Sequence, residues 1–172
     1  MFSKQYFLKE VKTLLENNYK TIKKDCKKVI QNKSLIQWPE KDIYNGTWDV
    51  YGLFDFQGLP IESAQKECTE TIKILSTISK IRAAGFSFLA PGTHITPHYG
   101  YESNVLRYHL GLIIPDGDCS LKVTNEKNVE TTYKWEEGKA FVFDDTELHE
   151  AWNRTNDPRY VLIVDILKEQ PC

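Results

Sequence analysis

Histidine is the residue type in this sequence best suited to chemistry near neutral pH, and its placement is uneven. All four histidines lie from His94 to His149. His98 lies just past the turn after one predicted strand, and His149 comes at the end of another. Two imidazoles at adjacent strand ends of a barrel can point at one metal ion. A redox-active iron needs neutral nitrogen ligands and several open positions, which such a pair could provide, although two histidines alone do not specify a metal site.

The carboxylate that usually completes such a site is missing from its place. It is expected two residues after the first histidine, where this chain has Gly100. Asp145 precedes His149 by four residues, and we expect it to orient an imidazole or a water molecule from behind the ligands. Direct ligation by Asp145 is the alternative. His94 is expected to be structural.

Short strands must position these residues. Runs of β-branched and aromatic residues, separated by turn signals, predict strands at 47–56, 85–89, 105–114, 120–124, 131–135, 139–143 and 160–167. Strands this short at such regular spacing indicate a sandwich or barrel, with the jelly roll among the options. Apolar residues spaced by three and four predict an amphipathic helix from Phe7 to Ile30 and a second helix from Glu62 to about Lys80.

Length and composition limit the class of protein. The chain has 172 residues, 41% hydrophobic and 27% charged, which suits one folded domain and excludes a disordered or collagen-like chain. No segment is long and apolar enough to span a membrane, and the first residues lack the apolar core of a signal peptide, so we expect a cytoplasmic protein. The four cysteines form no Cys-x-x-Cys pair, and we expect free thiols.

Charge is divided unequally along the chain. Residues 1–34 hold nine lysines and three acids, a net charge of +6, whereas the total is −2. A near-neutral total argues against nucleic acid as a partner. We expect the lysines to form the solvated face of the first helix. The alternative is an acidic partner, such as a carrier protein, an Asp-bearing substrate or a lipid surface.

Several sequence blocks resemble the catalytic domain of the aspartyl/asparaginyl β-hydroxylase family. The blocks occur in the family's order at compatible spacing and are residues 91–100, 106–112, 135–139, 143–152 and 159–165. The resemblance covers residues 45–167, more than two thirds of the chain. It implies one dioxygenase domain over 1–172, with an N-terminal helical extension at 1–44 packed on a catalytic core at 45–167.

The resemblance implies a mainly β fold, a double-stranded β-helix of the jelly-roll or cupin type, with an N-terminal helical segment. It also implies an Fe(II)- and 2-oxoglutarate-dependent dioxygenase that consumes O2 and uses ascorbate to keep the iron reduced. Members of the family hold iron with two histidines and no protein carboxylate, which matches His98, Gly100 and His149.

Five further residues match the family's co-substrate site. Arg159 matches the arginine that pairs with the distal carboxylate of 2-oxoglutarate, and Ser87 matches a serine near that carboxylate. Arg107 and His109 match residues close to the other end of the co-substrate, and Trp48 matches a tryptophan that lines the pocket. A planar guanidinium binds a carboxylate through two parallel hydrogen bonds, which suits the role of Arg159.

The family divides by substrate. Our first expectation is hydroxylation of an unactivated C–H bond at the β-carbon of Asp or Asn in a peptide, protein or amino-acid derivative, with release of succinate and CO2. The alternatives are hydroxylation of a lipid acyl chain, halogenation with chloride in the third-ligand position, and a non-catalytic metal-binding module on the same fold.

Overall fold

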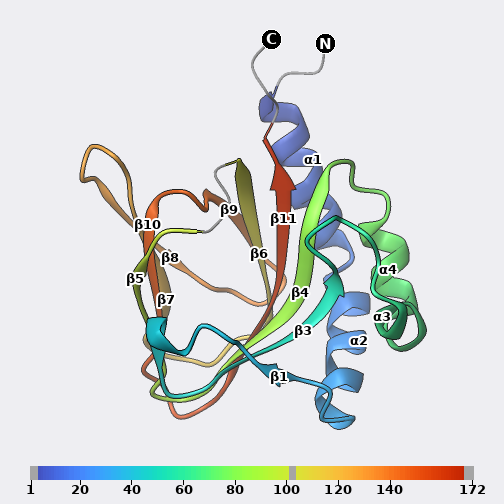
Figure 1. Ribbon diagram of the computed structural model, residues 1–172, viewed down its shortest axis with the longest axis horizontal. Coiled ribbons are helices and arrows are strands. Elements are labelled where there is room, and N and C mark those ends of the chain that lie inside the picture. Colours follow the sequence, from blue (N-terminus) through green and yellow to red (C-terminus); the bar gives the residue numbers. More distant parts are fainter. Residues whose placement is uncertain (1–3, 101–103, 169–172) are drawn as a thin grey trace.

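Two antiparallel β-sheets face each other in the computed structural model, which describes residues 4–100 and 104–168 (Figure 1). The larger sheet has the order β1 (Ile36–Gln37), β3 (Trp48–Phe54), β4 (Ile81–Leu89), β11 (Arg159–Leu167), β6 (Val105–Ile113) and β9 (Ala140–Asp144). The smaller sheet has the order β2 (Tyr44–Asn45), β5 (His94–His98), β10 (Leu148–Asn153), β7 (Cys119–Thr124) and β8 (Glu130–Lys134). The predicted mainly β, jelly-roll architecture is confirmed.

Four helices cover the outer face of the larger sheet (Figure 1). They are α1 (Lys4–Asn17), α2 (Tyr19–Gln31), α3 (Glu62–Glu67) and α4 (Thr69–Leu75), and a short 3-10 turn, η1 (Lys41–Ile43), precedes β2. The prediction of one helix from Phe7 to Ile30 was wrong in one respect, because the helix is interrupted at Asn18. The Asn18 side chain donates a hydrogen bond of 2.8 Å to the carbonyl of Leu14, which caps the end of α1.

The second predicted helix, Glu62 to about Lys80, is also two short helices. Cys68 leaves the helical conformation between them, with φ −122° and ψ 42°. The chain stops being helical at Leu75, and Lys80 has a positive φ of 62° just before β4 begins. The predicted helix was too long at its C-terminal end, because Ile78 continues the hydrophobic spacing and is buried without being helical.

Apolar side chains form two separate cores. One lies between the helices and the larger sheet and contains residues such as Leu15, Ile22, Phe86 and Leu162. The other lies between the two sheets and contains Trp48, Ile95, Trp135 and Phe143 among others. The candidate site occupies this second space, so both sheets can contribute side chains to it.

Two further expectations concern covalent and membrane features. Cys26, Cys68 and Cys119 are buried free thiols, and Cys172 lies outside the described residues. Within the described ranges, none of the helices combines the length and the apolar character that crossing a bilayer would require.

Candidate active site

His98 and His149 lie directly opposite each other on neighbouring strands of the smaller sheet. They are paired in the β5–β10 register, and their ring centroids are 4.3 Å apart. The next pair along is Ala151 with Ile95, so β5 has one extra residue in this interval and forms a bulge. Because of the bulge, His98 lines the same pocket as Ile95 although strict alternation would place them on opposite faces.

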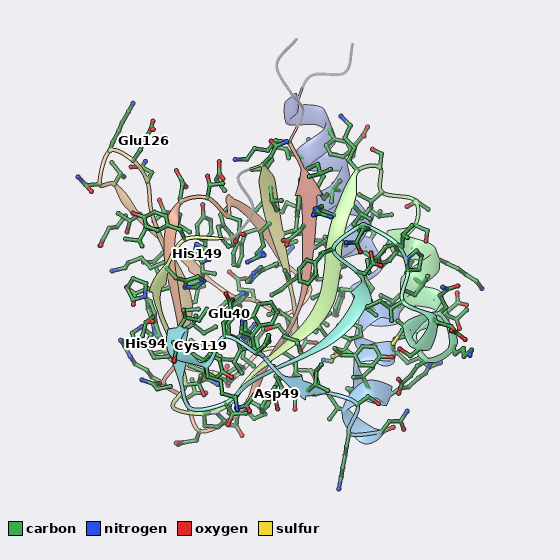
Figure 2. The ribbon with its side chains drawn as sticks, in the orientation of Figure 1. Glu40, Asp49, His94, Cys119, Glu126 and His149 are labelled. Carbon is green, nitrogen blue, oxygen red and sulfur yellow. The ribbon has the colours of Figure 1, made fainter. Side chains whose placement is uncertain are left out.

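The bulge also explains why His94 is not part of the site. Its Nε2 lies 2.7 Å from Glu150 Oε2, and Lys122 binds the other oxygen of the same carboxylate at 2.9 Å. His94 is therefore a structural residue of the sheet, as expected. Figure 2 shows the labelled side chains of His94 and His149 at separate places on the smaller sheet.

The strands that carry His98 and His149 were not predicted. His98 was expected after a strand and His149 at the end of one, whereas each belongs to a strand of its own, β5 and β10. β5 reads His-Ile-Thr-Pro-His, and its proline argues against a strand on sequence grounds. β5 nevertheless pairs with β2 on one side and β10 on the other.

Backbone carbonyls fix the tautomer of both histidines. His98 Nδ1 lies 2.8 Å from the carbonyl of Thr96, and His149 Nδ1 lies 2.7 Å from that of Glu147. A carbonyl only accepts hydrogen bonds, so each Nδ1 carries the hydrogen and each Nε2 keeps its lone pair. Burial lowers the pKa of His98 and lowers that of His149 to about 4. Both imidazoles are therefore neutral at pH 7, as metal ligands must be.

The described residues contain no group of three or more His, Cys, Asp or Glu side chains arranged to hold a metal. The position of the missing carboxylate is occupied in a different way. The Gly100 N–H donates to the Asp145 carbonyl at 2.9 Å, and a side chain at Gly100 would overlap the Asp145 carboxylate. Asp145 is completely buried, with Oδ1 3.6 Å from His149 Nε2. Asp145 thus fills the space beside Gly100, and its Oδ1 lies beyond hydrogen-bond reach of His149 Nε2.

Arg107 is held by two buried aspartates. Its Nε and Nη2 each donate a hydrogen bond of 2.7 Å to Asp165, and its Nη1 lies 2.6 Å from Asp145 Oδ1 in a close ion pair. The sequence named Arg107 and Asp145 but missed Asp165. Burial raises the pKa of Asp145 to about 6, and the charge of Arg107 opposes that rise.

Arg159 lies at the other end of the pocket and is completely buried. Its Nε and Nη1 have no hydrogen-bond partner, and its Nη2 lies 3.4 Å from Ser87 Oγ. The guanidinium carbon stacks over Trp135 at 4.6 Å. Trp48 Nε1 donates to Ser87 Oγ at 3.0 Å, so Trp48 fixes this hydroxyl. Burial lowers the pKa of Arg159 to about 10, which leaves it charged at pH 7.

His109 supplies a neutral donor between these two ends. Trp135 Nε1 donates to His109 Nδ1 at 3.1 Å, so the hydrogen of this ring is on Nε2, which is buried without a partner. Burial and the charge of Arg159 hold the pKa of His109 well below its usual value. Trp135, which sequence reasoning noted only as part of a motif, therefore orients both His109 and Arg159.

These observations test whether the implied groups fit. Two neutral histidines present free Nε2 lone pairs, and a buried guanidinium and a buried imidazole N–H have unpaired donors in the same pocket. Unpaired buried donors are costly and indicate a ligand with anionic oxygens. The residues present thus fit Fe(II) and the dianion 2-oxoglutarate.

Comparison with known proteins agrees with this geometry. The family model described as "Aspartyl/Asparaginyl beta-hydroxylase" matches residues 16–169, which begins upstream of the sequence blocks noted above. The chain is 36% identical over 161 residues to the ornithine lipid ester-linked acyl 2-hydroxylase of Rhizobium tropici, covering 90% of this chain and 56% of that protein. It is 34% identical over 159 residues to the aspartyl/asparaginyl beta-hydroxylase of Mus musculus, covering 88% of this chain and 21% of that protein. The chain thus spans about half of the first relative and a fifth of the second.

Solved structures support the fold. A prolyl-4-hydroxylase of Pseudomonas putida superposes with a TM-score of 0.61 at 14% identity, over 89% of this chain and 87% of that one. A 2OG-Fe(II) oxygenase family oxidoreductase of Burkholderia pseudomallei gives 0.56 at 13% identity, over 78% and 72%. At these identities the likeness concerns the fold alone.

Proposed function

The chain belongs to the aspartyl/asparaginyl β-hydroxylase family, and on that premise we propose that it uses Fe(II) and 2-oxoglutarate to hydroxylate an unactivated C–H bond. The observation that carries the proposal is the buried Arg159, whose unpaired donors share a pocket with the neutral pair His98 and His149. When bound, the iron and co-substrate would supply the oxidising chemistry, with succinate and CO2 as co-products.

The protein's own contribution is to bind, orient and exclude water. His98 and His149 would hold the metal through Nε2, and Arg159 with Ser87 would bind the distal carboxylate of 2-oxoglutarate. His109 offers its Nε2–H to an oxygen of the co-substrate. The rest of the lining is mainly apolar and limits access of water. This apolar part comprises Ile95, Leu121, Phe143, Ala151 and Ile163.

Asp145 favours hydroxylation over halogenation. A halide that replaced the missing carboxylate would need the space beside Gly100, where the Asp145 carboxylate lies. A chloride ion and the Asp145 carboxylate in the same buried space would repel each other strongly, so chloride binding there is disfavoured. Product mass distinguishes the two reactions. Hydroxylation adds about 16 mass units to the substrate, and replacement of hydrogen by chlorine adds about 34.

The number of positive charges free to bind a substrate carboxylate bears on which class of substrate the pocket takes. Arg107 and Arg159 are the cations among the described lining residues, and Arg107 is already shared by Asp145 and Asp165. A substrate carboxylate, as on aspartate, would therefore find at this end an arginine whose charge is already shared by two buried aspartates. A lipid acyl chain suits the apolar lining better, and a relative at 36% identity is named for acyl 2-hydroxylation. We place the acyl chain first and the β-carbon of Asn or Asp second.

The proposal is tested with the purified chain, Fe(II), ascorbate and 2-oxoglutarate. We expect slow succinate release without substrate, and loss of it in His98→Ala, His149→Ala and Arg159→Ala. Calorimetry with 2-oxoglutarate separates binding from turnover. Ornithine lipid and Asn- or Asp-bearing peptides are then compared by product mass. Normal succinate release from His149→Ala would contradict the assigned metal site. Failure of the wild type to bind either iron or 2-oxoglutarate would contradict the proposed dioxygenase function.

A further inference from the structure

Helix α2 carries a row of three lysines along its outer face. Lys20, Lys24 and Lys27 are spaced by four and three residues, so they lie on one side of the helix. All three are exposed, whereas Ile22, whose neighbours Cys26 and Val29 share its face, is buried against the larger sheet. We call these three residues the α2 lysine row.

The α2 lysine row has no internal function that the structure shows. Lys23 and Lys28, on either side of it, are committed to Glu137 at 2.6 Å and to the buried Asp25 at 2.7 Å. Within the described ranges the row itself forms no ion pair or side-chain hydrogen bond. Three uncompensated charges on one rigid helix face repel one another, and an anionic surface would relieve that repulsion.

The position of the row separates it from the candidate site. The helices lie on the outer face of the larger sheet (Figure 1), whereas the pocket is lined by residues of both sheets. The row therefore cannot contact a reacting group. What it can do is hold the whole domain against a partner.

The chemistry of the row favours a lipid surface over a protein. Protein interfaces are enriched in aromatic residues and arginine and depleted in lysine, because lysine is flexible and strongly hydrated. The row consists of lysine alone. Attraction to an anionic bilayer depends on the number of charges near the surface and requires no fitted contacts. We propose that the α2 lysine row docks this domain on an anionic membrane surface.

The inference draws on the proposed function only in the choice of a lipid partner, because an enzyme acting on an acyl chain must reach a membrane. Docking and turnover can be measured apart. Lys9, exposed on α1, adds a further positive charge on the same helical layer. Each lysine near an anionic surface is worth about 1 kcal/mol, or about fivefold in partitioning, so reversing three charges should weaken binding by at least about 100-fold.

The experiment is co-sedimentation of the full chain with vesicles, without iron or 2-oxoglutarate. We expect binding to phosphatidylcholine mixed with phosphatidylglycerol, little binding to phosphatidylcholine alone, and release by salt. The triple variant Lys20→Glu/Lys24→Glu/Lys27→Glu should lose binding, and the milder Lys→Gln triple should lose part of it. The control is Lys127→Glu/Lys134→Glu, which reverses two exposed charges on the smaller sheet and should leave binding intact.

The outcomes separate clearly. The proposal is overturned by absence of wild-type binding, by equal binding to neutral vesicles, or by equal losses in the row and control variants. It is also overturned if an acidic protein or a nucleic acid displaces the domain from vesicles at concentrations far below those of lipid. Succinate release by the triple variant should equal that of the wild type, so a failed docking result and a failed enzyme are distinguishable. Circular dichroism confirms that each variant is folded.

Discussion

Asp165 accepts two hydrogen bonds from the guanidinium of Arg107 across the β6–β11 pair. Nε and Nη2 each donate one, at 2.7 Å. The remaining nitrogen, Nη1, lies against Asp145. One guanidinium therefore pairs with two buried carboxylates, and the side chain named for the co-substrate is fixed by the protein itself. Arg107 can still contact a ligand, but only in the orientation that Asp165 allows.

The first prediction concerns Asp165→Asn. The amide can keep at most one of the two hydrogen bonds and loses the charge, so we expect a loss of about 1–3 kcal/mol in unfolding free energy. Binding of 2-oxoglutarate should change while Fe(II) affinity does not, because neither histidine contacts Asp165. Urea unfolding and calorimetry measure the two effects. Asp118→Asn, at an exposed pair with Arg154, is the control and should affect neither; equal effects would refute a positioning role for Asp165.

The second prediction concerns Arg159 and has opposite signs for stability and binding. A buried cation with two unpaired nitrogens destabilises the ligand-free protein. Arg159→Met should therefore raise the unfolding free energy by about 1 kcal/mol or more in the absence of 2-oxoglutarate. Arg159→Met should also abolish 2-oxoglutarate binding. Arg159→Lys should bind 2-oxoglutarate at least about tenfold more weakly, because an ammonium group lacks the planar pair of N–H donors that binds a carboxylate.

Urea unfolding with and without 2-oxoglutarate measures both effects of the Arg159 substitutions. Wild type should be stabilised by the ligand, and Arg159→Met should not. If Arg159→Met unfolds more easily than the wild type without ligand, the guanidinium is satisfied within the protein, and the inferred anion site loses its main support.

The third prediction concerns Gly100. A carboxylate introduced at this position would restore the usual spacing of a facial triad, yet its Cβ would overlap Asp145. Gly100→Asp should therefore weaken Fe(II) binding and destabilise the protein, and Gly100→Ala should do so nearly as much, since the conflict begins at Cβ. Tighter iron binding by Gly100→Asp would show that Asp145 moves aside readily. Calorimetry with Fe(II) under anaerobic conditions decides between these outcomes.

Sequence reasoning named residues that the structure brings into one pocket, but it predicted only some of the strands that carry them. Blocks of β-branched and aromatic residues predicted β3, β6, β7, β8, β9 and β11 close to their bounds, and the second half of β4. β5 and β10 were not predicted, because polar residues, histidine and proline interrupt the apolar pattern of a strand. The bulge that turns His98 inward depends on pairing with a strand distant in sequence. The contact of Asp165 with Arg107 was not predicted for a similar reason. Its partner Arg107 is 58 residues away, and only the β6–β11 register brings the two together.

The last prediction concerns pH and Glu67, which joins α3 to neighbouring elements. Its carboxylate accepts hydrogen bonds from Asn32 and from Tyr51 at 2.7 Å, and these bonds hold the pKa of Glu67 below its ordinary value. A group whose pKa is lower in the folded state stabilises the protein above its unfolded pKa. That contribution disappears as the pH falls through the folded value. Glu67→Gln should therefore cost about 1–2 kcal/mol at pH 7 and much less below about pH 4.

Urea unfolding of the wild type and Glu67→Gln at neutral and acid pH measures this difference. Glu62→Gln is the matched control, because Glu62 lies on the same helix and pairs with Lys66 while 84% exposed. An exposed pair contributes little, so Glu62→Gln should change stability by less than about 0.5 kcal/mol at either pH. A Glu67→Gln effect that persists unchanged into acid would mean that the side chain acts through packing. In that case the bonds to Asn32 and Tyr51 would owe nothing to the charge of the carboxylate.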